Sequence, residues 1–285
     1  MKIINPAVNH WLLENQKGTI TAVDPAGGGC IHQALFIRTE SGESYFLKQN
    51  QAAPADMFLR EEEGLNALRV PGGPVVPRVF LVGKSYLLLE DLHPAGRCKD
   101  FWQIYGRQLA EIHLNHHPQF GFKEDNYIGF NPQKNTWMDN GFDFFRENRL
   151  RPQIDLAMNR SLLDTEDLKA LEDLLQKLPQ IIPPQPASLI HGDLWSGNLI
   201  TDHQGRPALI DPAVHYGWAE ADLAMTDLFG RYPDEFFGAY EEVNPLESFY
   251  RSRFPFYNLY HLLNHLNLFG GGYLSRVRLT LKNLS

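Results

Sequence analysis

The stretch from residue 191 to residue 198 carries an imidazole, a carboxylate and a carboxamide between apolar neighbours. Its sequence is His191-Gly192-Asp193-Leu194-Trp195-Ser196-Gly197-Asn198. Polar groups at this density between apolar runs are costly unless chemistry uses them. The carboxylate of Asp193 could orient a substrate hydroxyl and accept its proton, while Asn198, five residues later, could hold Mg²⁺. Asp193 is therefore the candidate general base, although a tight turn alone would also account for it.

Asp211 is a candidate second ligand for the metal ion. It follows a short apolar run and precedes Pro212, and its carboxylate would add an anionic oxygen to the neutral oxygen of Asn198. Residues 199–201 and 208–210 are expected to form one small hairpin, which would bring both ligands to the same end. The two residues together predict a magnesium site, whereas Asp211 alone would be explained as an ordinary turn residue.

Lys48 ends an apolar strand, where kinases place the lysine that pairs with the α- and β-phosphates of ATP. Such a lysine needs an anionic partner, and the next helix offers acidic residues at positions 61–63. Glu61 shares a side of that helix with Phe58 and Leu65 at spacings of three and four residues. Lys48 and Glu61 are therefore expected to pair beside the nucleotide, with the other two glutamates on a solvated face.

Three glycines, Gly27, Gly28 and Gly29, separate the first two expected strands upstream of Lys48. Their position favours a loop whose backbone amides cover phosphates. The run lacks the spacing of the Gly-x-Gly-x-x-Gly motif, so a plain turn is the alternative. We expect these glycines to contact ATP.

The elements expected to position these residues are strands in the first third of the chain and mainly helices after it. Strands are expected at residues 19–24, 31–38, 44–48, 75–82 and 85–90, and helices at residues 5–15, 55–69, 99–115, 141–160, 165–178 and from residue 221 onward. This order predicts an α/β (α+β) fold with two lobes. Residues 1–90 would carry a five-stranded antiparallel sheet with a helix, and residues 91–285 a larger, mainly helical lobe. The polar, turn-rich residues 89–96 would form the hinge between them.

The composition excludes several other classes of protein. With 285 residues, 43% hydrophobic residues and a net charge of −8, the chain is globular and offers no basic track for nucleic acid. Its first residues lack the apolar core of a signal peptide, and no stretch is long and apolar enough for a membrane span. Two cysteines give no disulfide framework, so a reduced, cytoplasmic protein is expected.

The full set of motifs resembles the fructosamine kinase family, a branch of the protein-kinase-like fold that also includes aminoglycoside and choline phosphotransferases. The likeness runs through nearly the whole chain, and its most specific string is the loop at residues 191–198. It also includes Gly27-Gly28-Gly29-Cys30-Ile31, Phe46-Leu47-Lys48, Leu89-Glu90-Asp91-Leu92, Arg149-Leu150, Asp211-Pro212-Ala213 and Asn264-His265-Leu266-Asn267. The resemblance implies ATP- and Mg²⁺-dependent phosphorylation of the sugar 3-hydroxyl of ketosamines, either ribulosamines or fructosamines, on small amines or glycated proteins. The implied role is protein deglycation.

The same resemblance implies roles in phosphate transfer. Lys48 and Glu61 would hold the phosphates of ATP. Asp193 would be the base, and Asn198 and Asp211 would hold magnesium.

Further residues follow from the resemblance. Trp195 and His265 would form walls of the sugar pocket, because an indole offers an apolar face to the C–H surface of a sugar. Glu90 and Leu92, in the hinge, would lie beside adenine. Cys30 matches a cysteine of the family's phosphate loop whose oxidation links two subunits, so a monomer or a redox-dependent homodimer is expected. A core tryptophan and a loop thiol without a regulatory role are the plainer alternatives for Trp195 and Cys30.

Two other functions stay open. The first is a kinase for another small alcohol, such as an aminoglycoside, choline or a free sugar; an acidic pocket would favour a cationic substrate of this kind. The second is a catalytically inactive, nucleotide-binding pseudokinase, although every expected catalytic position is filled. The sequence leaves open which ketosamine is the substrate.

Overall fold

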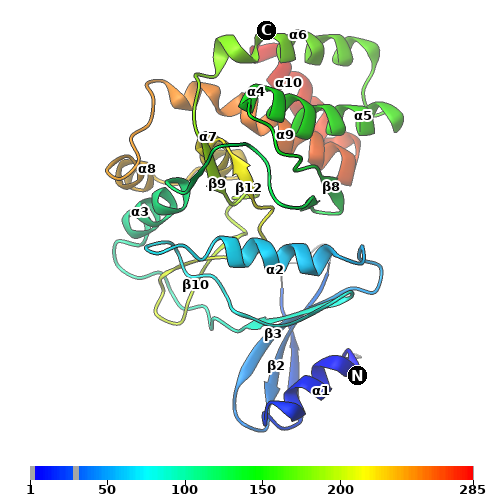
Figure 1. Ribbon diagram of the computed structural model, residues 1–285, viewed down its shortest axis with the longest axis vertical. Coiled ribbons are helices and arrows are strands. Elements are labelled where there is room, and N and C mark those ends of the chain that lie inside the picture. Colours follow the sequence, from blue (N-terminus) through cyan, green and yellow to red (C-terminus); the bar gives the residue numbers. More distant parts are fainter. Residues whose placement is uncertain (1–3, 28–31, 285) are drawn as a thin grey trace.

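The computed structural model describes residues 4–27 and 32–284, which form a sheet-rich part and a helical part (Figure 1). The first part is built on a five-stranded antiparallel sheet in the order β1-β2-β3-β5-β4. Its strands are β1 (Ile20–Pro25), β2 (Gln33–Thr39), β3 (Ser44–Gln49), β4 (Val79–Gly83) and β5 (Tyr86–Glu90). The predicted α/β fold with an N-terminal five-stranded antiparallel sheet is confirmed.

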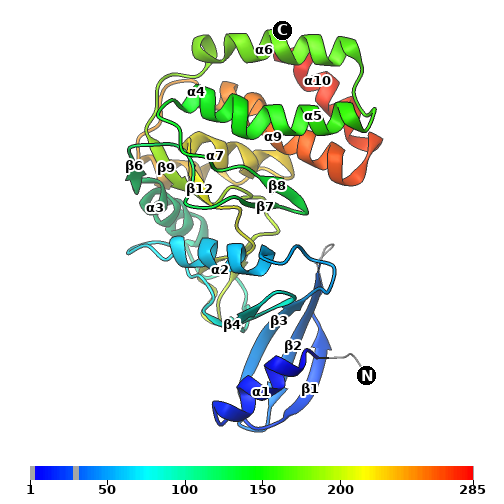
Figure 2. The same ribbon diagram turned by 45° about the vertical axis from the view of Figure 1, so that its right-hand side comes forward.

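Two helices cover the two faces of this sheet. They are α1 (Pro6–Glu14) and α2 (Met57–Ala67). Since side chains alternate along a strand, Tyr45 and Leu47 of β3 point to one face, where they join the small buried cluster that α1 closes. Phe46 and Lys48 point to the other face. Lys48 therefore meets α2, which lies between the sheet and the helical part in both views (Figures 1 and 2).

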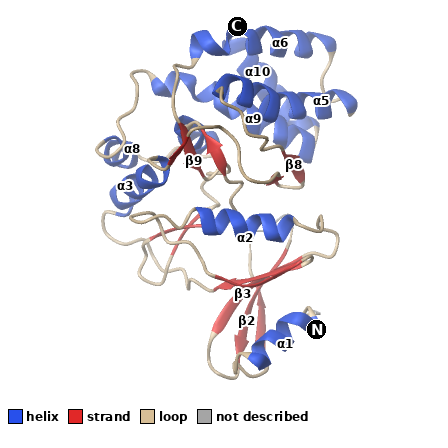
Figure 3. Ribbon diagram, in the orientation of Figure 1, coloured by secondary structure: helices blue, strands red, loops and turns tan. Residues whose placement is uncertain are grey.

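The second part of the chain is mainly helical (Figure 3). Its helices are α3 (Phe101–His113), α4 (Gly141–Phe144), the π-helical η1 (Phe145–Leu150), α5 (Arg151–Asn159), α6 (Thr165–Ile181), α7 (Ala219–Leu228), α8 (Asp234–Glu241), α9 (Tyr250–Phe269), the 3₁₀-helical η2 (Gly271–Tyr273) and α10 (Leu274–Leu284). The predicted helix at 141–160 is the run α4-η1-α5. The region from residue 221 onward is divided among several helices because Gly230, Pro233 and Gly270 interrupt it. None of the helices in the described residues is long and apolar enough to cross a membrane.

Short strands lie outside the main sheet, and two of them lead into and out of the loop at residues 191–198. The short strands are β6 (His116–His117), β7 (Asn126–Ile128), β8 (Asn131–Gln133), β9 (Ala187–Ile190), β10 (Leu199–Thr201), β11 (Pro207–Leu209) and β12 (His215–Gly217). β9 leads into the loop and β10 leads out of it. β10 and β11 form the predicted hairpin, with β11 shifted by one residue toward the N-terminus. β9 enters the loop and pairs antiparallel with β12. Because β12 begins shortly after Asp211, this pairing holds the segment around Asp211 beside the loop.

One predicted strand, at residues 75–82, is shorter than expected. β4 begins only at Val79, because Pro77 has no N–H to donate to the ladder. Val75 instead forms a parallel bridge to Ala208 of β11, with backbone hydrogen bonds of 3.0 and 2.8 Å. The sheet-rich part is thereby connected to the hairpin that follows the loop.

Candidate active site

Lys48 lies at the centre of a buried ion network. Its ammonium donates to Glu61 Oε1 at 2.6 Å and to the carboxylate of Asp211. Glu61 projects from α2 on the side it shares with Phe58 and Leu65, which are fully buried. The structure thus brings together the two residues that strand and helix periodicity paired, and adds Asp211 from a distant part of the chain. Although burial alone would lower the pKa of Lys48, the carboxylates of Asp211 and Glu61 hold it above its usual range.

Asp211 reaches Lys48 from a backbone conformation that few residues adopt. Its φ is +56°, in the left-handed region that Asp tolerates better than most residues. Its side chain is 44% exposed although one of its oxygens contacts Lys48. Asn198 Nδ2 approaches the Asp211 carbonyl at 3.4 Å. The two candidate metal ligands therefore lie side by side, next to the buried lysine.

The two polar side chains of the loop, Asp193 and Asn198, face each other. Asn198 Nδ2 donates to the backbone carbonyl of Asp193 at 2.8 Å and to its Oδ2 at 3.3 Å. The backbone N–H of Asp193 donates to His191 Nδ1 at 3.2 Å, which keeps the turn tight. Burial, together with the nearby Asp211 carboxylate, raises the pKa of Asp193 to about 7. A pKa near neutral is what a general base requires.

The oxygens of Asn198 and Asp211 fit a magnesium ion. The amide nitrogen of Asn198 faces Asp193, while its Oδ1 accepts no hydrogen bond from any residue in the described part of the chain. Asp211, whose backbone carbonyl Asn198 approaches, adds an anionic carboxylate. Mg²⁺ is usually bound by one or two carboxylates and completes its shell with waters and substrate phosphates. The donor set therefore suits a magnesium–nucleotide complex.

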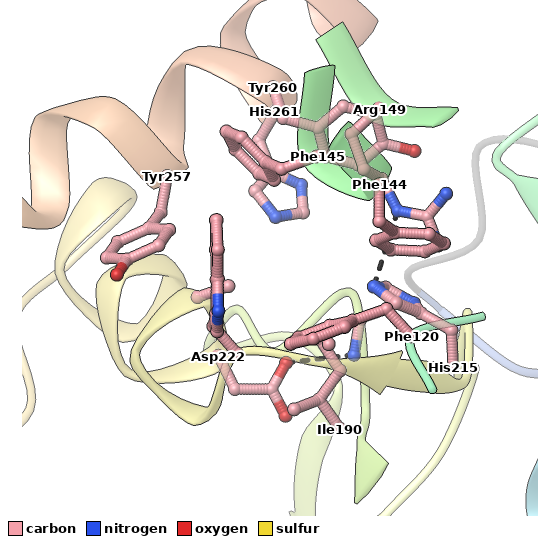
Figure 4. Close-up of a pocket in the computed structure, with 14 residues that line it drawn as sticks. Phe120, Phe144, Phe145, Arg149, Ile190, His215, Asp222, Tyr257, Tyr260 and His261 are labelled. Carbon is pink, nitrogen blue, oxygen red and sulfur yellow. Dashed lines mark hydrogen bonds between the residues drawn. The ribbon is translucent and has the colours of Figure 1, made fainter. Parts of the chain in front are cut away.

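The carboxylate of Asp222, on α7, is hydrogen-bonded to the turn of the loop (Figure 4). Its carboxylate accepts the backbone N–H of His191 at 2.6 Å and that of Gly192 at 2.8 Å, and it bonds His113 Nε2 at 3.2 Å. Although burial alone would raise the pKa of Asp222, the hydrogen bonds from His113 and the backbone keep it below its usual value. Sequence patterns gave no prediction for Asp222, because the position of an acidic residue on an apolar helix does not show which distant residue it contacts.

Gly192 is required by the close packing of this turn. Its φ is +83°, and a Cβ at this position would lie 2.1 Å from the carbonyl oxygen of Ala213. His191, the preceding residue, is fully buried and donates from Nε2 to the carbonyl of Ile210 at 3.0 Å. The loop is thus fixed against the segment that carries Asp211.

The residues predicted to contact the nucleotide lie at the hinge and in the glycine-rich segment. The carboxylate of Glu90, at the end of β5, accepts the backbone N–H of Arg78 at 3.1 Å. Leu92 is buried, and no residue that the structure describes accepts its backbone N–H, which leaves that donor for a ligand. Gly27 is exposed with open space beside it. The predictions for Gly28, Gly29 and Cys30 lie outside the described residues.

Trp195 and His265 are connected by one aromatic ring. The ring centroid of Phe229 lies 6.4 Å from that of Trp195 and 4.9 Å from that of His265. Trp195 is 38% exposed, which argues against a core tryptophan. His265 donates from Nδ1 to the carbonyl of His261 at 2.8 Å. The three rings form an aromatic wall beside the loop, and no motif pointed to Phe229.

Comparison with known proteins gives matches along nearly the whole chain. A family model described as fructosamine kinase matches residues 5–285. A probable ketoamine kinase of Synechocystis sp. is 42% identical over 260 residues, which cover 90% of this chain and 87% of that protein. The chloroplastic protein-ribulosamine 3-kinase of Arabidopsis thaliana is 37% identical over 280 residues, which cover 94% of this chain and 84% of that protein.

Solved structures share the fold. A Thermobifida fusca protein assigned as a fructosamine-3-kinase matches with a TM-score of 0.89 and 33% identity, covering 99% of each chain. An aminoglycoside phosphotransferase in a ternary complex with ADP and hygromycin B matches with a TM-score of 0.62 and 17% identity, covering 98% of this chain and 96% of that one. The second likeness concerns the fold alone. The predicted protein-kinase-like fold is confirmed.

Proposed function

Since the chain belongs to the fructosamine kinase family, we propose that it transfers the γ-phosphate of ATP to the sugar 3-hydroxyl of ketosamines. It is a phosphotransferase with a hydroxyl group as acceptor. Relatives named ketoamine kinase and ribulosamine 3-kinase favour a ketosamine over an aminoglycoside, choline or a free sugar. The structural observation that carries the proposal is the contact of Lys48 with Asp211, whose backbone carbonyl neighbours Asn198.

Asp193 is the proposed base. Its carboxylate binds the 3-hydroxyl of the sugar and accepts the proton as that oxygen attacks the γ-phosphorus. Asn198 orients the carboxylate through its amide nitrogen, and its Oδ1 holds Mg²⁺ together with the carboxylate of Asp211. The bound ion supplies positive charge that offsets the negative charge of the phosphate oxygens.

Lys48 is the proposed ligand of the α- and β-phosphates. Glu61 keeps its ammonium charged and in place when the nucleotide binds. ATP lies between the sheet and the helical part, with Glu90 and Leu92 beside adenine and the glycines at 27–29 over the phosphates. Both ATP and Mg²⁺ are expected from the donor groups, and the ADP complex of the distant aminoglycoside phosphotransferase also supports the nucleotide.

The aromatic wall of Trp195, Phe229 and His265 is the proposed sugar side of the site. An exposed indole can stack on the C–H face of a ribulosamine or a fructosamine while polar groups bind its hydroxyls. Because Trp195 is exposed, a sugar attached to a small amine or to a lysine of a glycated protein could reach it. Phosphorylation of such an adduct makes protein deglycation the proposed role.

Several broader predictions stay proposals. The division into lobes 1–90 and 91–285, with a hinge at residues 89–96, suits the change from strands to helices. A redox-dependent homodimer formed through Cys30, as opposed to a monomer, is a prediction from the family resemblance. A cytoplasmic location is a prediction from the low cysteine content.

The test is ADP release by the purified protein with ATP and Mg²⁺ on a panel of acceptors. The panel contains ribuloselysine, fructoselysine, an aminoglycoside, choline and a free pentose. Release above background with a ketosamine and not with the other acceptors is the expected result. No release with any ketosamine would refute the proposal, and release with choline or the aminoglycoside alone would favour the kinase for another alcohol. ATP binding without turnover on any acceptor would indicate a pseudokinase.

A further inference from the structure

Arg149 is a buried arginine without an acidic partner. It is 1% exposed and belongs to η1, and π-helical turns of this kind recur at functional sites. Its guanidinium donates to the carbonyls of Lys134 at 2.5 Å and Asn148 at 2.9 Å, to Asn135 Oδ1 at 2.7 Å and to His215 Nε2 at 3.3 Å. No carboxylate of the residues described here lies within ion-pair distance of it, and burial lowers the pKa of Arg149 to about 10. A buried charge held only by neutral acceptors is costly and calls for a role beyond packing.

His215 transmits the orientation of Arg149 to the backbone near Asp211. Because Nε2 of His215 accepts from Arg149, its Nδ1 carries the proton and donates to the carbonyl of Ala213 at 3.1 Å. Burial and the charge of Arg149 keep the pKa of His215 well below its usual value. Arg149 thus fixes the tautomer of His215, and His215 fixes the Ala213 carbonyl.

Ala213 connects the segment of Asp211 to the turn that presents Asp193. Its N–H donates to the carbonyl of His191 at 2.9 Å. Its carbonyl faces Gly192 so closely that a Cβ there would lie 2.1 Å away. Ala213 follows Asp211 by two residues, and Gly192 directly precedes Asp193. A shift of the Ala213 peptide would therefore change the distance between the two carboxylates.

On the side of Arg149 and His215, hydrogen bonds add to the close packing of Gly192 in setting the position of the loop. A cavity of about 20 Å³, room for a water molecule, is lined by Arg149, His215, Gly192 and Asp222 (Figure 4). Figure 4 shows the Arg149–His215 bond on one side of this space and Asp222 with its bond to the loop on another. The ring of Phe144 lies 4.5 Å from the guanidinium carbon and holds it over the aromatic face.

We propose that Arg149 and His215 are a positioning pair that sets the distance between Asp193 and Asp211 during phosphate transfer. The inference rests on the proposed function, because that function gives the two carboxylates their roles. The pair acts through Ala213, and none of the hydrogen-bond partners described for Arg149 and His215 belongs to the proposed nucleotide or sugar site. It should therefore affect the rate of the chemical step more than the binding of either substrate.

Two kinds of variant test the pair. Arg149→Lys keeps the charge but cannot bond all four acceptors in one plane, and His215→Leu removes the donor to Ala213. Each should lower kcat by about tenfold or more, with the KM for ATP and for the ketosamine within about threefold of the wild type. His215→Asn places an amide nitrogen near the position of Nδ1. Its kcat should therefore be about threefold or more higher than that of His215→Leu.

Arg253→Lys is the matched control. Arg253 is also buried in the helical part, and it bonds Glu220 Oε2 at 2.8 Å and not the loop. This variant should lower Tm and leave kcat within about twofold. If Arg149→Lys and His215→Leu likewise lower Tm without changing kcat, the pair is merely structural and the proposal is wrong. A raised KM with unchanged kcat would also overturn it.

Hydrogen exchange separates this inference from the proposed function. In the absence of substrates, the backbone N–H of Ala213 should exchange about tenfold faster in Arg149→Lys than in Arg253→Lys. Equal exchange in the two variants would overturn the positioning pair whatever the enzyme phosphorylates. Faster exchange in a protein that turns over no ketosamine would support the pair and refute only the proposed substrate.

Discussion

The carboxylate of Asp222 accepts the backbone N–H of Gly192 at 2.8 Å, across thirty residues of chain, and so anchors the loop to α7. The neighbouring N–H of His191 bonds the same carboxylate at 2.6 Å. Two consecutive N–H groups that point at one anion fix the orientation of a peptide turn more firmly than one bond would. The next residue in the chain is Asp193, so Asp222 determines the position of the proposed base.

Asp222→Asn tests this anchor. The amide can accept only through its single oxygen, so one of the two backbone bonds is lost, and a hydrogen bond to a buried charged group contributes about 1.5–3 kcal/mol. We expect kcat to fall by roughly 10- to 100-fold while the KM for ATP changes little. Steady-state kinetics on a ketosamine provides the measurement.

Glu220→Gln is the control for Asp222. Glu220 lies on the same helix and is equally buried, but its carboxylate bonds Arg253 and Tyr257. It should cost stability without a comparable loss of kcat. Equal kinetic losses in the two variants would show that any disturbance of α7 slows the reaction, and the anchor would lose its support.

Asp193→Asn tests the proposed base. The amide keeps the size of the side chain and removes the proton acceptor, so kcat should fall by about 10²- to 10⁴-fold, with ATP binding nearly intact. Turnover on a ketosamine and calorimetric ATP binding measure the two effects. A variant that keeps more than about a tenth of the rate would contradict the role of Asp193 as general base.

Glu61→Gln tests the partner of Lys48. The variant replaces a charged partner at 2.6 Å by a neutral one in a buried site, so the ammonium is drawn toward Asp211 and away from the phosphates. We expect kcat/KM for ATP to fall by roughly 10- to 100-fold. Glu62→Gln, one residue further along α2 and without a bond to Lys48, should stay within about twofold. Similar losses in both would mean that the helix surface, not the ion pair, matters.

Local periodicity is why Lys48 and Glu61 could be paired from the sequence. The alternation of β3 places Lys48 on the face covered by α2, and spacings of three and four residues place Glu61 beside Phe58 and Leu65. The five strands and the helix between them follow from the same rules. Catalytic spacing in the loop is likewise local, because Asp193 and Asn198 belong to one turn.

Asp222, Arg149 and Phe229 could not be predicted in the same way. Asp222 and Arg149 are single residues on helices, and Phe229 follows the end of α7. The partner of each belongs to an element far along the chain, so the contact depends on how the helices pack. β9 and β12 were also not predicted, because β9 is buried along its whole length and β12 has only three residues, too few for an alternating pattern to stand out. The residues that hold the loop in place are therefore known only from the folded structure, whereas the candidate catalytic residues within the loop can be identified from the sequence.

Phe229→Ala tests the aromatic wall. Phe229 fills the space between Trp195 and His265, and its removal should loosen both rings against the sugar. We expect the KM for a ketosamine to rise about three- to tenfold, with the KM for ATP unchanged, because an aromatic contact contributes about 0.5–1.5 kcal/mol. Phe249→Ala, at a ring that is 84% exposed, serves as the control. An unchanged ketosamine KM in Phe229→Ala would remove this residue from the substrate site.

His261→Phe tests how pH acts on stability. His261 is buried, its Nδ1 has no partner among the residues that the structure describes, and burial lowers its pKa to about 3. Between pH 6.5 and 3 the unfolded chain binds a proton at His261 that the folded chain does not. The free energy of unfolding therefore falls, as the pH falls through this window, by about 1.4 kcal/mol per pH unit from this group alone. Phenylalanine abolishes that loss.

Urea unfolding at pH 7 and pH 5 measures the effect. When the pH is lowered from 7 to 5, the stability of His261→Phe relative to the wild type should increase by about 2 kcal/mol. The reason is that pH 5 lies roughly 1.5 pH units below 6.5, where the protonation of the unfolded wild type begins. At pH 7 the change should be small, since the ring is replaced by one of similar shape beside a cavity of about 20 Å³ and an unpaired nitrogen is removed. His10→Gln, at an exposed histidine, should show no such increase. If the relative stability of His261→Phe does not depend on pH, then His261 is not held neutral by burial.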